Sequence, residues 1–151
     1  MIRWTVAAVH LLALGLGLGA VWARGRALRG ELDAAGLRRV FYADSWWGAA
    51  AGVWIATGLL RAFAGLEKGS AYYLHNHLFW AKMGLLVLIL LLEIGPMVTL
   101  IRWRIALARG VPVDTHRAGR FARISFLQAG LVMLMVLAAT GMARGYGAAA
   151  P

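Results

Sequence analysis

The chain has 151 residues, of which 62% are hydrophobic and 15% are charged. With a mean hydropathy of +0.71, this composition indicates an integral membrane protein and excludes a soluble globular domain. The formal net charge of +10 would favour nucleic acid in a soluble protein, but the basic residues flank apolar segments here, so no nucleic-acid partner is expected. The absence of cysteine excludes disulfides, thiolate metal sites and covalently attached c-type haem.

Four segments are long enough to cross a hydrocarbon core of about 30 Å. They cover residues 4–23, 43–62, 78–101 and 121–143. We therefore predict an all-α fold, an integral membrane four-helix bundle that forms one transmembrane domain over residues 1–151. Glycine pairs at GxxxG spacing in the first two segments are expected to mark close helix packing; they are Gly15 with Gly19 and Gly48 with Gly52.

Basic residues are distributed unevenly between the two sides of the predicted bundle. The connections after the first and third segments are rich in arginine: Arg24, Arg26, Arg29, Arg38 and Arg39, then Arg102, Arg104, Arg109, Arg117, Arg120 and Arg123. The other side carries Arg3, Arg61, Lys68 and Arg144. The positive-inside rule then predicts two Arg-rich cytoplasmic loops, both termini outside, and a multi-pass protein of the bacterial inner (plasma) membrane.

The third segment contains two charges, Lys82 and Glu93, within HNHLFWAKMGLLVLILLLEIGP at residues 75–96. A charge inside the bilayer is unfavourable by roughly 2.5–3.5 kcal/mol or more, so each needs a partner or a function. Lys82 either snorkels to the headgroups or acts as a proton donor or counter-ion. Glu93 is expected to face a cavity, or to pair with Asp44 or with arginines at the helix ends. Lys82 and Glu93 are the candidate catalytic residues.

His10 is the candidate metal ligand, because it lies about 9 Å inside the first segment. Residues Ala13, Leu14 and Gly17 form a mostly small strip beside the imidazole, against which a flat ring could lie. Neutral imidazole is a common axial ligand of haem iron. The alternative is a histidine that hydrogen-bonds a neighbouring helix and binds nothing.

His75, His77 and Arg61 complete the predicted cofactor-binding set with His10. His75 and His77 precede the third segment, and Arg61 ends the second, so all three lie on the side of His10 and Lys82. Two histidines separated by one residue point about 200° apart on a helix, so they can share one metal only if the segment is extended. Otherwise they are polar residues near the interface.

The sequence resembles a family of predicted four-helix bacterial membrane proteins, a domain of unknown function. The resemblance rests on HLLALGLGLGAVWARGRAL at residues 10–28, ADSWWG at 43–48 and FWAKMGLLVLILLLEIGPMVTLIRWR at 79–104. The chain is more distantly similar to the membrane protoporphyrinogen oxidases of the HemJ type, which are haem-associated four-helix proteins. That likeness implies a haem-ligand position at His10 and an essential lysine at Lys82. After the first helix the chain has VWARGRALRG in place of the aromatic-rich run of those enzymes.

These observations leave three functional hypotheses open. The first is a protein that binds one haem b or related porphyrin near the outer surface, in electron transfer with a quinone or in tetrapyrrole oxidation. The second is a small proton-coupled transporter in which Asp44, Glu93 and Lys82 line a path. The third is an accessory or assembly subunit of a larger membrane complex. The lipid bilayer is the expected partner in each case, with a homodimer or a larger complex as the oligomeric form.

Overall fold

The computed structural model describes residues 1–64 and 70–147, and in this part of the chain all regular structure is helical. The helices are α1 (Ile2–Ala27), α2 (Ala34–Phe63), α3 (Ser70–Leu74), α4 (His77–Ala108) and α5 (Ala118–Ala143). The prediction of an all-α fold is confirmed. Lys68 and the last four residues of the predicted domain lie outside the described residues.

Each predicted segment falls within one of the four long helices, and each helix extends beyond it. Among the described residues, α1, α4 and α5 are long and apolar enough to cross a membrane. Helix α2 has 30 residues and is long enough, but Asp44, Ser45 and two tryptophans lower the hydropathy of its predicted span. The chain is therefore a helical membrane protein with three clear membrane-spanning helices.

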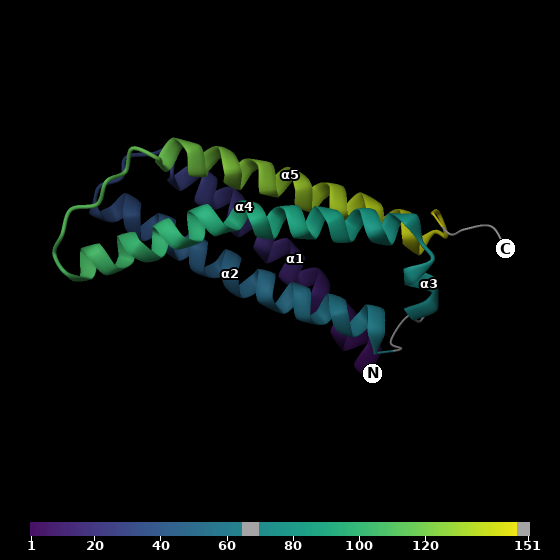
Figure 1. Cartoon of the computed structure of the whole chain (residues 1–151). Coiled ribbons are helices and arrows are strands. Elements are labelled where there is room, and N and C mark those ends of the chain that lie inside the picture. Colours follow the sequence, from purple (N-terminus) through teal and green to yellow (C-terminus); the bar gives the residue numbers. More distant parts are fainter. Residues whose placement is uncertain (65–69, 148–151) are drawn as a thin grey trace.

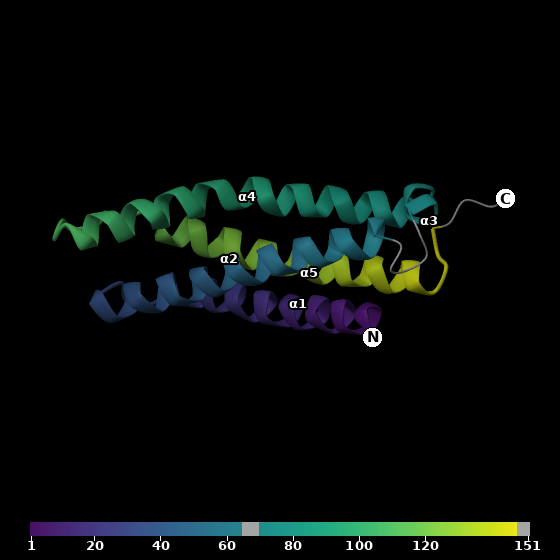
Figure 2. The same cartoon turned by 90° about the horizontal axis from the view of Figure 1, so that it is seen from below.

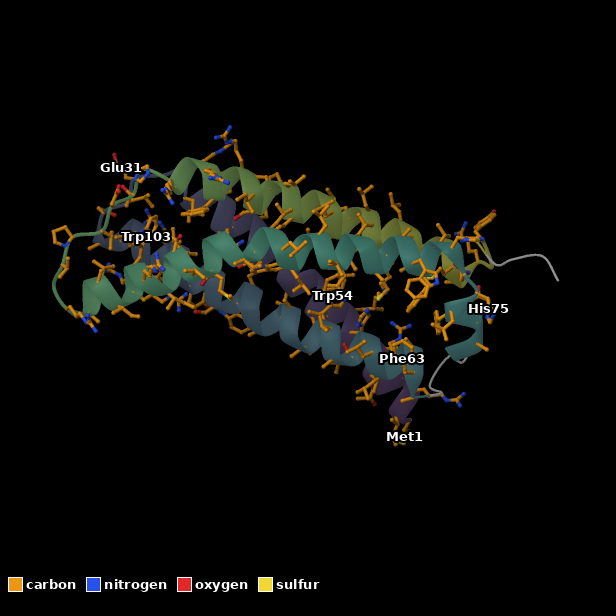
Figure 3. All side chains as sticks on the ribbon, viewed as in Figure 1. Met1, Glu31, Trp54, Phe63, His75 and Trp103 are labelled. Carbon is orange, nitrogen blue, oxygen red and sulfur yellow. The ribbon has the colours of Figure 1, made fainter. Side chains whose placement is uncertain are left out.

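The long helices form two hairpins, α1/α2 and α4/α5, that pack together through α1 and α5. Figure 1 shows that the hairpins lie close where residues 28–33 and 109–117 connect their helices, and splay apart toward α3. In the perpendicular view of Figure 2 the four long helices run side by side. We call the two ends of the molecule the loop end and the α3 end. Figure 3 labels Glu31 and Trp103 at the loop end, and His75 at the α3 end.

Asp33 explains why α2 begins nine residues before the predicted span at residue 43. Its side chain accepts a hydrogen bond from the backbone N–H of Gly36 at 2.7 Å, which is an N-cap contact. A Cβ at Gly36 would collide with the carbonyl oxygen of Glu31, so this turn requires glycine. The predicted loop after the first segment is accordingly a short turn.

Asn76 caps α4 and fastens the C-terminal segment to it. Its Oδ1 accepts hydrogen bonds from the backbone N–H groups of Leu78 (2.9 Å) and Phe79 (3.3 Å), while Nδ2 donates to the carbonyl of Tyr146 (3.0 Å). The backbone N–H of His77 donates to the carbonyl of Gly147 at 2.9 Å. The residue between the two histidines is therefore a buried structural cap.

The GxxxG prediction is wrong for packing within this chain. A Cβ added to Gly15, Gly19, Gly48 or Gly52 would have no atom within 4 Å. The close approach of α1 and α2 uses Gly17 instead, where a Cβ would lie 3.4 Å from Ala50 and 3.5 Å from Trp47. Gly17, one end of the small strip beside His10, is therefore covered by α2.

Candidate functional site

Arg24 lies at the centre of a buried polar network near the loop end. Its side chain is fully buried. The Nε atom donates to Ser125 Oγ at 3.0 Å, and Nη1 donates to Asp44 Oδ1 at 2.9 Å and Glu93 Oε1 at 2.6 Å. The Nη2 atom donates to Glu93 Oε2 at 2.8 Å and Gln128 Oε1 at 2.9 Å. The guanidinium thus has a partner on each nitrogen, including a bidentate carboxylate.

A second arginine and a glutamine extend the network. Arg104 Nη2 donates to Asp44 Oδ2 and to the carbonyl of Phe41, each at 2.9 Å. Gln128 Nε2 donates to Glu93 Oε2 at 2.8 Å and to the carbonyl of Ile89 at 3.2 Å. The four charges of the network cancel, and each of the four long helices contributes a member. The Nε atom of Arg104 is buried and has no hydrogen-bond partner among the described residues. Because the four charges are paired and Arg24 is bonded through every nitrogen, we assign the network a structural role.

The placement of Arg24 in a cytoplasmic loop is wrong. Helix α1 continues to Ala27, so Arg24 lies within it and faces two carboxylates supplied by α2 and α4. A buried guanidinium is stable there because the opposite charges and hydrogen bonds replace its hydration. The sequence carried a signal, since Asp44 and Glu93 in apolar segments both needed a cation, and Arg24 lies on the same helical face as His10 and Gly17.

An apolar layer separates this network from the residues at the α3 end. Ile89 of α4 and Val132 and Met135 of α5 are buried there in one core cluster. Ile89 lies between Lys82 and Glu93 in the sequence of α4, so these two charges belong to different sites. The polar path that the transporter hypothesis requires from Lys82 to Glu93 would have to cross this layer.

A cavity of about 440 Å³ lies between the two hairpins near the α3 end. All five helices line it, and most of its wall is aliphatic or aromatic. Among the described residues, its polar or positively charged lining residues are His10, Arg61, Tyr72, Tyr73, Lys82 and Thr140, and none of those that line it is acidic. The structure thus brings together three of the predicted site residues, His10, Arg61 and Lys82, in one cavity.

His10 is bound by protein groups through both of its ring nitrogens. Trp54 Nε1, which can only donate, donates to His10 Nε2 at 3.1 Å. The proton therefore lies on Nδ1, which is 2.9 Å from Thr57 Oγ1 and donates to it. A Cβ at Gly58 would lie 3.2 Å from His10 Cε1, so glycine is needed for α2 to approach the ring. His10 is a neutral imidazole with an occupied lone pair.

This arrangement does not fit axial ligation of haem iron. A ligating imidazole needs a free lone pair on one nitrogen, and here Trp54 occupies it. Iron could reach Nε2 only after Trp54 moved out of the wall. No group of three or more histidine, cysteine or acidic residues able to hold a metal ion occurs within residues 1–64 and 70–147.

Lys82 lines this cavity, and its positive charge has no partner in the described part of the chain. It lies five residues after the start of α4 and is half-buried. Residues 1–64 and 70–147 provide no hydrogen bond or ion pair to its ammonium group. Arg61 is close enough for the two like charges to repel each other. The cavity therefore combines apolar walls with one cation, Lys82, that has no partner among the described residues.

His75 and His77 lie outside the cavity. Both side chains are exposed, and His75 Nδ1 is 2.8 Å from the carbonyl oxygen of Ala71, within α3. The two residues lie on either side of the Asn76 cap, at the end of α3 and the start of α4. The structure thus separates them from His10, Arg61 and Lys82. An asparagine before an apolar helix is an N-cap signal that sequence reasoning missed here.

Asp114 and His116 form an exposed pair in the connection between α4 and α5. The backbone N–H of His116 donates to Asp114 Oδ1 at 3.0 Å, and the imidazole Nδ1 lies 2.6 Å from Oδ2. These hydrogen bonds from His116 lower the pKa of Asp114 below its ordinary value. Neither residue lines the cavity.

Comparison with known proteins identifies the family of this chain. A family described as "Predicted membrane protein (DUF2214)" matches residues 2–147. The chain belongs to this family. No curated protein and no solved structure matches the sequence. The resemblance to an uncharacterised membrane family is confirmed, and the likeness to the membrane protoporphyrinogen oxidases gains no support.

Removing Arg24 should destabilise this DUF2214 protein strongly. Arg24→Met leaves two carboxylates without their central cation, so the free energy of unfolding in detergent micelles should fall by about 3–5 kcal/mol. Arg26→Gln, at an exposed arginine two residues further on, is the matched control and should have little effect. The double variant Arg24→Met/Glu93→Met keeps a balanced charge and should recover much of the loss. Additive losses in this cycle would contradict the assigned network.

Proposed function

We propose that the protein binds one amphipathic molecule with an acidic group in the cavity between the two hairpins. The observation that supports this proposal is the environment of Lys82. This cation is half-buried in a largely apolar wall and has no partner among the described residues. A cation held in low dielectric is stabilised strongly by an opposite charge. An acidic headgroup would supply that charge, and the apolar walls would bury the remainder of the ligand.

The shape and charge of the cavity support this class of ligand. A volume of about 440 Å³ lies within the range of roughly 300–1,000 Å³ that is usual for small-molecule sites. Because none of the described residues that line the wall is acidic, none of them competes with the ligand for Lys82. His10 is neutral and already bonded, so its role in this proposal is to hold Trp54 in the wall.

The proposed orientation places the cavity in the outer half of a bacterial inner membrane, with all four long helices crossing it. The loop end keeps a surplus of exposed arginines even after Arg24 and Arg104 are assigned to the network; they are Arg26, Arg29, Arg38, Arg39, Arg102, Arg109, Arg117, Arg120 and Arg123. This asymmetry supports a cytoplasmic loop end and termini outside.

Haem b or a related porphyrin is our second proposal. The observation in its favour is that His10 shares a wall with Lys82, which could pair with an acidic side group of a porphyrin. The proposal requires Trp54 to release His10 Nε2 before iron is bound. A metal-free porphyrin would need no such change and would belong to the acidic amphiphiles of the first proposal.

Replacing Lys82 should abolish the preference for an acid. Native mass spectrometry of delipidated protein should show one bound hexadecanoate and much weaker binding of hexadecanol, the uncharged match. Lys82→Met should weaken hexadecanoate binding by about tenfold to a hundredfold, the value of a hydrogen bond to a charged group. Lys82→Arg should retain most of the hexadecanoate binding.

The control is Arg144→Gln, at an exposed cation outside the cavity, and it should bind hexadecanoate as the unmodified protein does. Equal binding of hexadecanoate and hexadecanol would refute the proposal.

The haem proposal predicts a Soret band in protein purified from haem-replete cells. His10→Ala should remove the band, whereas Trp54→Phe should increase haem occupancy because it releases Nε2. His75→Ala and His77→Ala should leave the spectrum unchanged, since both side chains lie outside the cavity. A colourless protein from such cells would rule out haem as the resident ligand.

The orientation can be tested with single cysteines, because the chain has none of its own. Glu31→Cys and His75→Cys place one thiol at the loop end and one at the α3 end, at positions labelled in Figure 3. A membrane-impermeant maleimide added to spheroplasts should label the second variant and reach the first only after lysis. The reverse pattern would invert the proposed topology.

A further inference from the structure

We infer that the ligand enters the cavity sideways from the lipid, through the gaps between the two hairpins, and is therefore a membrane-soluble acid. This inference rests on the proposed function, because it assigns a route and a solubility class to the same ligand. It follows from two observations about the cavity. Its α3 end is covered by a helix that is held by hydrogen bonds and ring contacts, and its sides are lined by exposed apolar residues.

The first observation is that α3 covers the end of the cavity. Figure 1 shows α3 at the end of the bundle, beside the space between the splayed hairpins. Tyr72 and Tyr73 of α3 line the cavity. The hydroxyl of Tyr72 donates to the carbonyl of Met142 in α5 at 2.9 Å, and the Tyr73 ring lies 5.6 Å from the Phe79 ring of α4.

Further hydrogen bonds hold this cover in place. Trp80 Nε1 donates to the carbonyl of Leu74, the last residue of α3, at 3.0 Å. Beside it, Asn76 and His77 bind the carbonyls of Tyr146 and Gly147. Entry from the water at this end would have to break several of these contacts together, because they join α3, α4, α5 and the C-terminal segment.

The second observation is that the sides of the cavity open where lipid would lie. Leu11 of α1 and Leu59 of α2 line the cavity and are nevertheless 61% and 49% exposed. Phe63, at the end of α2, lines it too and is 52% exposed. An exposed apolar side chain on a membrane-spanning helix faces hydrocarbon, so these residues border passages into the bilayer.

The chemistry of the passages selects the ligand class. A small water-soluble anion would lose its hydration in the hydrocarbon before it reached Lys82, which is unfavourable. An amphiphile can keep its acidic group near the interface while its apolar part remains in lipid, and Lys82 lies only about 8 Å inside α4. The inferred ligand is thus a single acidic amphiphile that is already dissolved in the outer leaflet.

The test blocks the two sides and leaves the end intact. Leu11→Cys/Leu59→Cys supplies the only thiols of the chain, and a bulky maleimide that neither absorbs nor quenches tryptophan emission should obstruct both passages when attached there. Uptake of brominated hexadecanoate from vesicles is followed by quenching of Trp54, which lines the cavity, with Trp54→Phe as the background. Labelling should slow both uptake and release by about tenfold, whereas a label that only removed ligand contacts would speed release.

Two further variants make the result decisive. Leu12→Cys/Leu90→Cys, at exposed leucines that do not line the cavity, should show no effect of the label. Trp80→Phe, which removes the bond to the carbonyl of Leu74 at a residue that does not line the cavity, should leave the uptake rate unchanged. Unchanged uptake after labelling at Leu11 and Leu59, or faster uptake in Trp80→Phe, would overturn lateral entry. Absence of any quenching in the unlabelled protein would instead refute the proposed function, and this route with it.

Discussion

The ion pairs of Arg24 with Asp44 and Glu93 are the constraint on which the arrangement of the helices depends. They bring α2 and α4 to the same guanidinium of α1, and Ser125 and Gln128 add α5. In a membrane the hydrophobic effect does little to bring helices together, so packing and polar contacts must do so. Here the polar contacts are concentrated at the loop end, and this is where the hairpins lie close together (Figure 1).

The cavity lies at the opposite end of the bundle from these polar contacts. Toward the α3 end the hairpins meet through aromatic contacts, such as Phe63 with Phe79 at 6.4 Å between ring centroids, and through the contacts of α3. The polar groups that remain there either satisfy one another, as His10, Trp54 and Thr57 do, or face the cavity, as Lys82 does. One end of the bundle thus holds matched charges, and the other holds a cation without a partner in residues 1–64 and 70–147, with an apolar layer between them.

Much of this structure could be predicted from the sequence, because apolar length and periodicity determine where helices form in a membrane protein. The four helices, the inward positions of Lys82 and Glu93, and the shared cavity of His10 with Lys82 all follow from such patterns. The sequence could not show that the turn at Asp33 lengthens α1 and α2, which moves Arg24 from a loop into the core. It also could not show that Trp54 donates a hydrogen bond to His10 Nε2, since that contact joins residues 44 positions apart.

The position of Arg24 in the chain also affects the order in which the protein can be assembled. Asp44 follows Arg24 by only 20 residues, so the first hairpin can enter the membrane with this arginine already neutralised. Glu93 follows by 69 residues and needs a cation when α4 inserts. A completed α1/α2 hairpin then offers a preformed receptor for α4. The first half of the chain can therefore act as a template for the second during synthesis.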